Sequence, residues 1–281
     1  MLCKNYRSYS ISFFCAFSFI VLHSQERAQD SSAFGLALPD IGKTIPRQAG
    51  KTSVRESAVY YRAQHDYLFF LETIVSYAFS DFFGVQIGMP IIVAFQKNFH
   101  RSAGASDARV ELSFNIYNQP NFLANIMVGV QFPSGNARVI PNTGTGSFDF
   151  VGRFTTVHSS EHWYMGYKTS AFVTHTRRHF KNGNFYFFEM GFGPKFHFNK
   201  KSPLHCYCIG QLFGILFEQD KFNNITLQNT GGQVYFFGPL LSATWKGFLV
   251  EGSFLVPIGQ SRYGNQPKFD FRTALTFEIT F

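Results

Sequence analysis

The sequence predicts an all-β protein, an up-and-down antiparallel transmembrane β-barrel of about 12 strands. Three observations predict it: an amino-terminal export signal, connections that alternate between short and long, and a final strand with strict apolar–polar alternation. The chain has 281 residues, of which 19% are aromatic and only 15% are charged. A membrane barrel can turn aromatic side chains outward to lipid and to its interfacial girdles, whereas a soluble protein must bury them.

Residues 1–24 have the layout of a secretory signal peptide. Basic residues precede the uncharged stretch ISFFCAFSFIVL, and we expect cleavage near Ser24. This stretch is too short to span a bilayer as a helix, and no later run approaches about 18 apolar residues. A membrane-spanning protein must therefore use strands. Residues 25–53 are polar and interrupted by Gly and Pro, which indicates a periplasmic lead or plug segment.

The predicted barrel occupies residues 54–281. From the second candidate strand onward, short turns alternate with long loops, which is typical of outer-membrane barrels with short periplasmic turns and long outer loops. The even number of strands places both termini in the periplasm. The candidate strands are 54–64, 67–79, 82–95, 108–118, 121–132, 147–158, 161–174, 184–198, 203–217, 233–245, 247–257 and 269–281.

The last strand, FDFRTALTFEITF, shows which face meets lipid. Phe269, Phe271 and Phe277 fall on one side, and Asp270 and Arg272 on the other, because successive strand residues point to opposite faces. Arg272 facing lipid near mid-membrane would cost about 2–4 kcal/mol, so we expect the phenylalanines to face lipid. Periodicity alone would also fit a soluble barrel or sandwich that buries them.

The same alternation assigns a nearly balanced set of charges to the lumen. These side chains could line a water path, or they could pair across strands and seal it. Twelve strands lie between the filled eight-stranded barrel and the open 16-stranded porin, so barrel size leaves both alternatives open. The candidate lumen-lining residues are Glu72, Arg109, Glu111, Asp149, Arg153, Lys168, Glu189, Lys195, Glu251, Asp270, Arg272 and Glu278.

Several stretches together resemble the meta-pathway phenol-degradation family of outer-membrane proteins. They lie between residues 67 and 281 and include VSYAFSDFFGVQIGMPIIVAF, SAGASDARVELSFNIY, VGVQFPSGN, GTGSFDFVGRFTTVH and VPIGQSRYGNQPKFDFRTALTFEITF. The chain has Ser106 and Asn136 where family members commonly have Gly and Asp. The resemblance implies an outer-membrane barrel suspected of carrying hydrophobic or aromatic compounds. Bacterial barrels also resemble one another in a final aromatic residue, here Phe281, which the barrel-assembly machinery recognises.

Enzymatic and metal sites are not expected. His158 and Ser160 have the spacing of the catalytic pair in outer-membrane phospholipase A, but they fall at a predicted periplasmic turn and no third residue orients the His. Cys206 and Cys208 share one face of a predicted strand and lack the further ligands that a metal needs. We therefore expect no catalytic residues, no metal and no cofactor.

The function expected from the sequence is a bacterial outer-membrane channel or transporter that passes small solutes, hydrophobic or aromatic ones included, by passive diffusion. The alternative is a non-conducting structural or adhesive surface barrel. The formal charge is +8, with most basic residues in predicted loops. Because an exported chain seldom meets nucleic acid, the expected partners are outer-membrane lipids and lipopolysaccharide, the assembly machinery and a small solute.

Overall fold

The computed structural model describes residues 49–97, 99–119, 121–136, 141–177, 179–197 and 204–281. The predicted signal peptide and nearly all of the predicted lead fall outside these ranges, so both stay predictions. Over the described ranges, no helix is long and apolar enough to cross a membrane. The regular structure consists of antiparallel strands.

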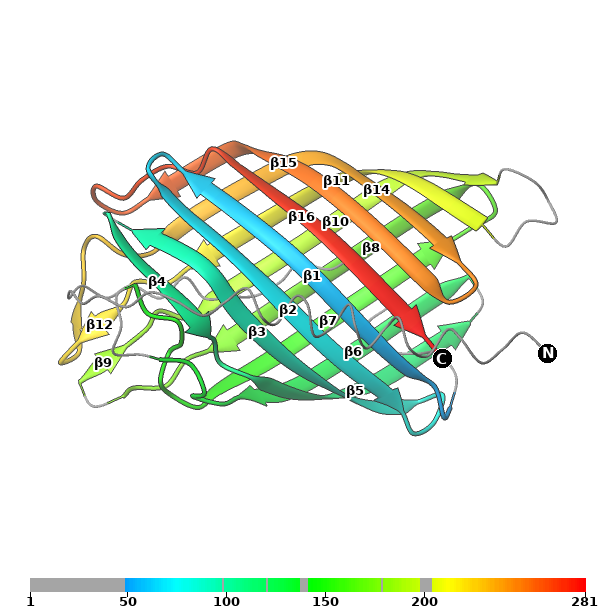
Figure 1. The fold of residues 1–281 in the computed structure, drawn as a ribbon, viewed down its shortest axis with the longest axis horizontal. Helices are drawn as coiled ribbons and strands as arrows, with labels where there is room; N and C mark the ends of the chain where they lie inside the picture. The colour runs from blue at the N-terminus through cyan, green and yellow to red at the C-terminus, as the bar shows by residue number, and fades with distance from the viewer. Residues whose placement is uncertain (1–48, 98, 120, 137–140, 178, 198–203) are drawn as a thin grey trace.

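Twelve strands close into a barrel (Figure 1), which confirms the predicted fold class and strand number. Each strand pairs with its neighbour in the chain, and β1 pairs with β16 to complete the ring, with Val59 opposite Ala274. The barrel strands are β1 (Thr52–Ala63), β2 (Asp66–Ala78), β3 (Phe83–Lys97), β5 (Arg109–Gln119), β6 (Phe122–Gln131), β7 (Asp149–Ser159), β8 (Trp163–Val173), β10 (Phe185–His197), β11 (Leu204–Phe217), β14 (Gly232–Trp245), β15 (Phe248–Arg262) and β16 (Phe271–Thr280).

The two ends of the barrel differ in their connections. At the short-turn end, strands are joined by turns such as Lys246–Gly247, and the last residue, Phe281, pairs with Thr52. At the long-loop end, β4 (His100–Ala105) extends the hairpin of β3. Two long loops there contribute β9 (Phe180–Lys181), β12 (Lys221–Phe222) and β13 (Ile225–Thr226) to a small separate sheet. In outer-membrane barrels the long loops face the outside of the cell.

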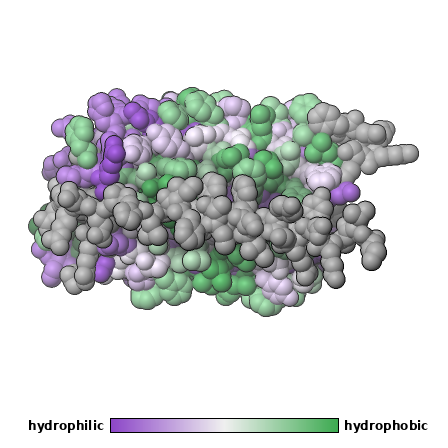
Figure 2. All heavy atoms as spheres, in the orientation of Figure 1, coloured by the Kyte–Doolittle hydropathy of each residue, from purple (hydrophilic) through white to green (hydrophobic). Residues whose placement is uncertain are grey.

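The outer wall is apolar, as the alternation predicts. Phe150, Phe254 and Phe277 are among many large apolar side chains that are at least half exposed on this wall. Figure 2 shows hydrophobic side chains over the middle of the visible face and hydrophilic ones at the end that carries β9 and β12. An apolar band of this kind matches the hydrocarbon core of a bilayer.

Strict alternation fails at two positions, and at one of them a predicted orientation is wrong. A register irregularity between Asn115 and Tyr117 turns Tyr117 to the outer wall, where it is exposed together with Ile116. Phe269 precedes β16 and lies inside the barrel against Tyr61 and Phe236, although the pattern placed it with the lipid-facing residues. Simple alternation fails at both positions because a bulge, or the end of a strand, breaks the two-residue period.

Candidate functional site: the barrel interior

The interior side chains form two layers. The charge layer crosses the middle of the barrel and contains five cations and five carboxylates, all buried: Arg55, Arg109, Arg153, Lys168, Arg272, Glu72, Glu111, Glu189, Glu251 and Glu278. On its long-loop side lies the aromatic layer, also buried: Tyr61, Phe70, Phe95, Phe172, Phe185, Phe187, Phe213, Phe236 and Phe269. Each strand contributes inward residues at alternate positions, so neighbouring strands build both layers together.

One half of the charge layer is an ion-pair network centred on Arg109. Its guanidinium pairs with Glu72 on one side, and its Nε lies 3.3 Å from Oε2 of Glu111. Nε of Arg153 lies 2.9 Å from the other oxygen of Glu111, and Gln86 donates a hydrogen bond to Oε2 over 2.5 Å. Because buried charges are costly unless they are paired, this mutual neutralisation is what allows them to fill the lumen.

Glycines make room for this network. A Cβ atom at Gly129 would lie 2.3 Å from the carbonyl oxygen of Val110 and 2.6 Å from Cγ of Glu111. At Gly88 it would lie 3.0 Å from Nε of Arg109. The long charged side chains of β5 therefore lie over strand positions that carry no side chain.

The other half of the layer is centred on Glu189 and Glu278. Arg55 pairs with Glu278, and Lys168 lies opposite Glu189 in the β8–β10 register. Gln211 donates a hydrogen bond to Glu189. Buried polar atoms in both halves lack a hydrogen-bond partner among the described residues, including Oε2 of Glu72, Nη2 of Arg153, Oε2 of Glu189 and Oε1 of Gln211. Since buried polar groups are almost always hydrogen-bonded, these atoms mark places for water or a polar solute.

The aromatic layer is a continuous set of ring contacts. Phe172 stacks on Phe185 with ring centroids 4.6 Å apart, and Phe213 lies 6.0 Å from both Phe187 and Phe236. Every member is at most 6% exposed. The ring contacts extend from Phe172 on β8 to Tyr61 on β1, on the long-loop side of the charges.

Arginines join the two layers. The guanidinium of Arg272 lies 4.9 Å from the ring centroid of Phe213 and 5.6 Å from that of Tyr61, and its Nε donates to the Tyr61 hydroxyl. Arg153 lies 5.8 Å from the ring of Phe172. Cation–π contacts of this kind are favourable when the cation is desolvated. The boundary between the layers therefore presents both ring faces and hydrogen-bond donors.

A buried carboxylate fixes the outer loop beside the aromatic layer. Oδ1 of Asp107 accepts a hydrogen bond from Gly135 N over 2.8 Å, and Oδ2 accepts from Thr145 N and Thr145 Oγ1 over 2.5 and 2.8 Å. A Cβ atom at Gly144 would lie 2.3 Å from Oδ1 of Asp107. The Ser-Asp, Pro-Ser-Gly-Asn and Gly-Thr-Gly-Ser stretches of the sequence thus meet at one carboxylate.

Most of the sequence-predicted residues lie inside the barrel, but three lie outside the charge layer. Asp149 is buried at the long-loop end, where its carboxylate accepts hydrogen bonds from Ser147 and from His175 N. Lys195 is half-buried towards the short-turn end, with Nζ 5.8 Å from the Tyr207 ring. Asp270 is exposed at the long-loop rim and accepts a hydrogen bond from Gln64 N, so its assignment to the lumen is wrong.

Sequence reasoning missed Arg55, the aromatic layer and Asp107. Arg55 could have been found, because Ser53, Arg55 and Ser57 alternate with Val54 and Ala58. The aromatic layer gave no such signal. Where phenylalanine occurs on both faces of a strand, apolar and polar residues do not alternate, so the sequence does not show which ring points inward. Asp107 lies between strands, where alternation carries no information.

The residues considered for other chemistry do not gather into a site. The Ser160 hydroxyl accepts a hydrogen bond from Trp163 N in the β7–β8 turn, and His158 lies against the Phe122 ring. Cys206 and Cys208 are free thiols. Over the described ranges, no three His, Cys, Asp or Glu side chains are grouped to hold a metal ion.

A family model described as "Putative MetA-pathway of phenol degradation" matches residues 38–265. The chain belongs to this family, as the sequence motifs predict. Comparison with curated proteins returned no match.

The chain is also similar to solved outer-membrane barrels. An outer membrane channel from Pseudomonas putida F1 has a TM-score of 0.67 at 13% identity, covering 87% of this chain and 100% of that one. The NanC porin has a TM-score of 0.46 at 10% identity, covering 81% and 98%. The β domain of the Bordetella autotransporter BrkA has a TM-score of 0.49 at 8% identity, covering 83% and 100%. Only the first similarity bears on the fold, and it supports the closed β-barrel.

Proposed function

We propose that this protein is an outer-membrane channel that passes small aromatic or hydrophobic solutes by passive diffusion. The observation that carries the proposal is the buried aromatic layer in the barrel interior, on the long-loop side of a charge layer of five cations and five carboxylates. A solute with an apolar ring can exchange contacts with these rings, whereas a hydrated ion would lose its water there.

The boundary between the layers favours solutes that also carry a small polar group. Among the described residues, Nη2 of Arg153 and Oε2 of Glu189 are buried without hydrogen-bond partners. Arg153 lies 5.8 Å from the Phe172 ring, and Phe187 lies two residues from Glu189 towards the long-loop end of β10. A neutral hydroxyl can accept a hydrogen bond from an arginine and donate one to a carboxylate. The candidate lumen-lining residues of the charge layer would then contact the solute as it passes.

The comparisons agree with this proposal. The family description refers to phenol degradation, and the Pseudomonas putida protein is described as an outer membrane channel. We further propose that the chain is not an enzyme and that it reaches the outer membrane after cleavage of its signal peptide near Ser24.

Swelling of liposomes that contain refolded protein, residues 25–281, tests the proposal. We expect faster protein-dependent swelling in isosmotic resorcinol than in glucose or potassium benzoate, after correction for protein-free liposomes. Changing Phe213→Ala and Phe236→Ala together opens the aromatic layer and should admit glucose and raise single-channel conductance. Phe277→Ala, on the lipid-facing wall, is the matched control and should change neither.

Two outcomes would contradict the proposal. Equal swelling of the unaltered protein in glucose and resorcinol would show an unselective water-filled pore. A folded barrel with no protein-dependent swelling in any solute would show that the lumen does not conduct. Folding is checked independently by the change in gel mobility on heating that closed barrels display.

A further inference from the structure

The small sheet at the long-loop end has two different faces. In its register, Lys181 lies opposite Lys221, which lies opposite Thr226, while Phe180 and Ile225 both lie opposite Phe222. Because successive strand residues point to opposite sides, one face carries the two lysines and the other carries the apolar side chains. Figure 1 shows β9 and β12 of this sheet beyond the end of the barrel wall.

The backbone of this sheet is well defined. β12 and β13 are joined by Asn223 and Asn224, which have φ values of 49° and 63°, as a tight two-residue hairpin requires. Asn223 N donates to His179 O over 2.8 Å, which holds the hairpin beside β9. The position of the two lysines is therefore set by backbone pairing.

The lysine pair has no carboxylate partner among the residues that the structure describes. Like charges directly opposite each other across an antiparallel pair are destabilising. In the part of the chain that the structure describes, no carboxylate forms an ion pair with Lys181 or Lys221. An anion shared by the two ammonium groups would turn this repulsion into attraction.

The apolar face is also uncovered. Ile225 is 69% exposed and Phe222 is 49% exposed, although both belong to a paired strand. A partner that satisfies both faces must therefore combine anionic and apolar parts.

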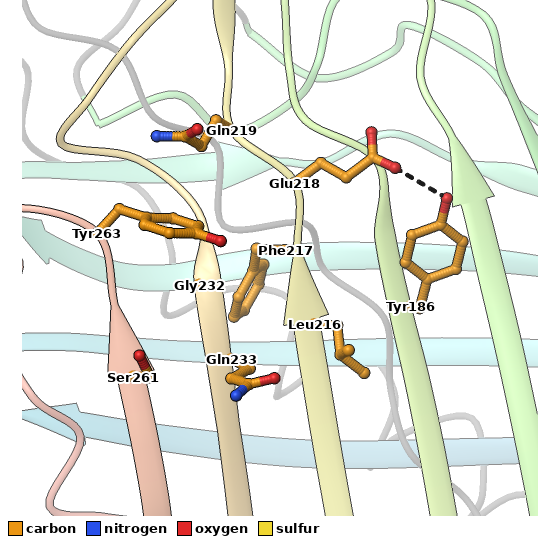
Figure 3. Close-up of a pocket in the computed structure, with 9 residues that line it drawn as sticks. All are labelled: Tyr186, Leu216, Phe217, Glu218, Gln219, Gly232, Gln233, Ser261 and Tyr263. Carbon is orange, nitrogen blue, oxygen red and sulfur yellow. Dashed lines mark hydrogen bonds between the residues drawn. The ribbon is translucent and has the colours of Figure 1, made fainter.

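A cleft also opens at the long-loop end of the outer wall, beside the chain segment that leads into β12. It has a volume of about 420 Å³ and lies between the tops of β10, β11, β14 and β15, with Leu216 and Tyr263 among its lining residues. Figure 3 shows Glu218 at its edge, where the carboxylate accepts a hydrogen bond from the Tyr186 hydroxyl over 3.1 Å. Only Gln219 and Asp220 separate Glu218 from Lys221 in the chain.

We propose that the small sheet and this cleft bind lipopolysaccharide of the outer leaflet. The lysines of β9 and β12 contact a phosphate on its sugar backbone, and the side chains of Phe222 and Ile225, with the cleft below, contact its acyl chains. The location agrees, because the long loops of an outer-membrane barrel emerge at the level of this lipid's headgroup. Charge complementarity selects a phosphorylated lipid over a neutral one. This inference rests on the outer-membrane fold and is independent of whether the lumen conducts.

The test measures, by native mass spectrometry in neutral detergent, how purified lipid A-type lipopolysaccharide binds to the full mature chain and to its variants. We expect the double variant Lys181→Ala, Lys221→Ala to bind at least tenfold more weakly than the unaltered protein. Lys268→Ala removes an exposed charge from the same rim outside the sheet and should bind normally. Phe222→Ser keeps the lysines and should weaken lipopolysaccharide binding as well.

Competition separates a lipid site from a simple anion site. Inorganic phosphate at the same phosphorus concentration should not displace lipopolysaccharide from the unaltered protein. Equal binding by the unaltered protein and the double lysine variant would overturn the proposal. Full displacement by inorganic phosphate, together with normal binding by Phe222→Ser, would equally overturn it, because the site would then recognise an anion alone. Each variant is used only after its gel mobility shows a closed barrel.

Discussion

Asp107 is a single carboxylate that connects three separate stretches of backbone. It accepts hydrogen bonds from Gly135 N, Thr145 N and Thr145 Oγ1 and is 1% exposed. The change Asp107→Ala leaves these buried donors without partners, and each unsatisfied donor costs about 1–3 kcal/mol. We expect hydrogen exchange of residues 132–136 and 141–148 to become much faster, while β1 and β2 keep their protection.

The matched control is Asp270→Ala. Asp270 is exposed and accepts a hydrogen bond from one backbone donor, Gln64 N, so its loss should leave exchange of the 132–148 loop unchanged. Unchanged exchange in Asp107→Ala would show that the loop is held by its other contacts.

Glu56 is a carboxylate on the outer, lipid-facing side of the barrel wall. It lies between the inward residues Arg55 and Ser57, and its Oε1 accepts a hydrogen bond from Thr73 on the outer face of β2. A carboxylate facing lipid destabilises a barrel, although less than Arg or Lys would. We therefore expect Glu56→Leu to raise the free energy of unfolding in lipid vesicles by about 1 kcal/mol.

Replacing a carboxylate of the charge layer should instead lower the free energy of unfolding. Glu72→Leu removes a partner of buried Arg109 and should lower the free energy of unfolding by about 3–5 kcal/mol. Urea titration of both variants measures the two changes. A loss of stability in Glu56→Leu would mean that the carboxylate contributes to the fold through Thr73.

At the scale of elements, the barrel strands were predictable from the sequence, but the short strands in the outer loops were not. All twelve barrel strands are visible in the sequence, because a strand with one lipid face and one lumen face must alternate. The small sheet was not predictable, because β9, β12 and β13 have two residues each and contain no period. The charge layer was largely predictable from the lipid penalty on residues such as Arg272. The aromatic layer was not, since a ring is tolerated on either face.

The loops that carry the small sheet should respond to pH through Asp220. Burial raises the pKa of Asp220 from 3.8 to about 6, against weaker opposing effects of the Gly183 N–H and the Lys97 charge. The folded loops then bind a proton that the unfolded loops release. Their stability is full below about pH 4 and falls as the pH rises through 6, by up to about 3 kcal/mol.

Hydrogen exchange of residues 179–184 and 220–227, corrected for the intrinsic rate at each pH, measures this effect. Protection should be greater at pH 5 than at pH 7.5 in the unaltered protein. Asp220→Asn keeps an oxygen that can accept from Gly183 N but cannot titrate, so its protection should be independent of pH over this range. Greater protection at pH 7.5 in the unaltered protein would reverse the assigned sign.

At the scale of the whole molecule, the interior replaces the water-filled lumen of larger barrels with side chains. Twelve strands enclose a space that arginines and glutamates can cross, and Arg272 on β16 reaches the ring of Phe213 on β11. Five cations and five carboxylates leave the layer without net charge. This interior is consistent with the proposed passage of neutral, ring-bearing solutes.

The last residue combines two backbone hydrogen bonds to β1 with an exposed aromatic ring. Phe281 N donates to Thr52 O over 2.9 Å, Thr52 N donates to Phe281 O over 3.3 Å, and the aromatic ring is 58% exposed on the outer wall. Deleting Phe281 removes both backbone bonds and the ring, so we expect severalfold less barrel in the outer membrane. Phe281→Ala keeps the backbone bonds, and Phe281→Tyr also keeps an aromatic ring.

Heat-dependent gel mobility of outer-membrane fractions separates the two contributions. If the assembly machinery recognises the ring, Phe281→Ala should fail as the deletion does, while Phe281→Tyr should assemble normally. If the backbone bonds that close the barrel between β1 and β16 are what matters, Phe281→Ala should assemble and only the deletion should fail. The first pattern is expected, because ten further residue pairs already join β1 to β16, so two more backbone bonds add little to closure.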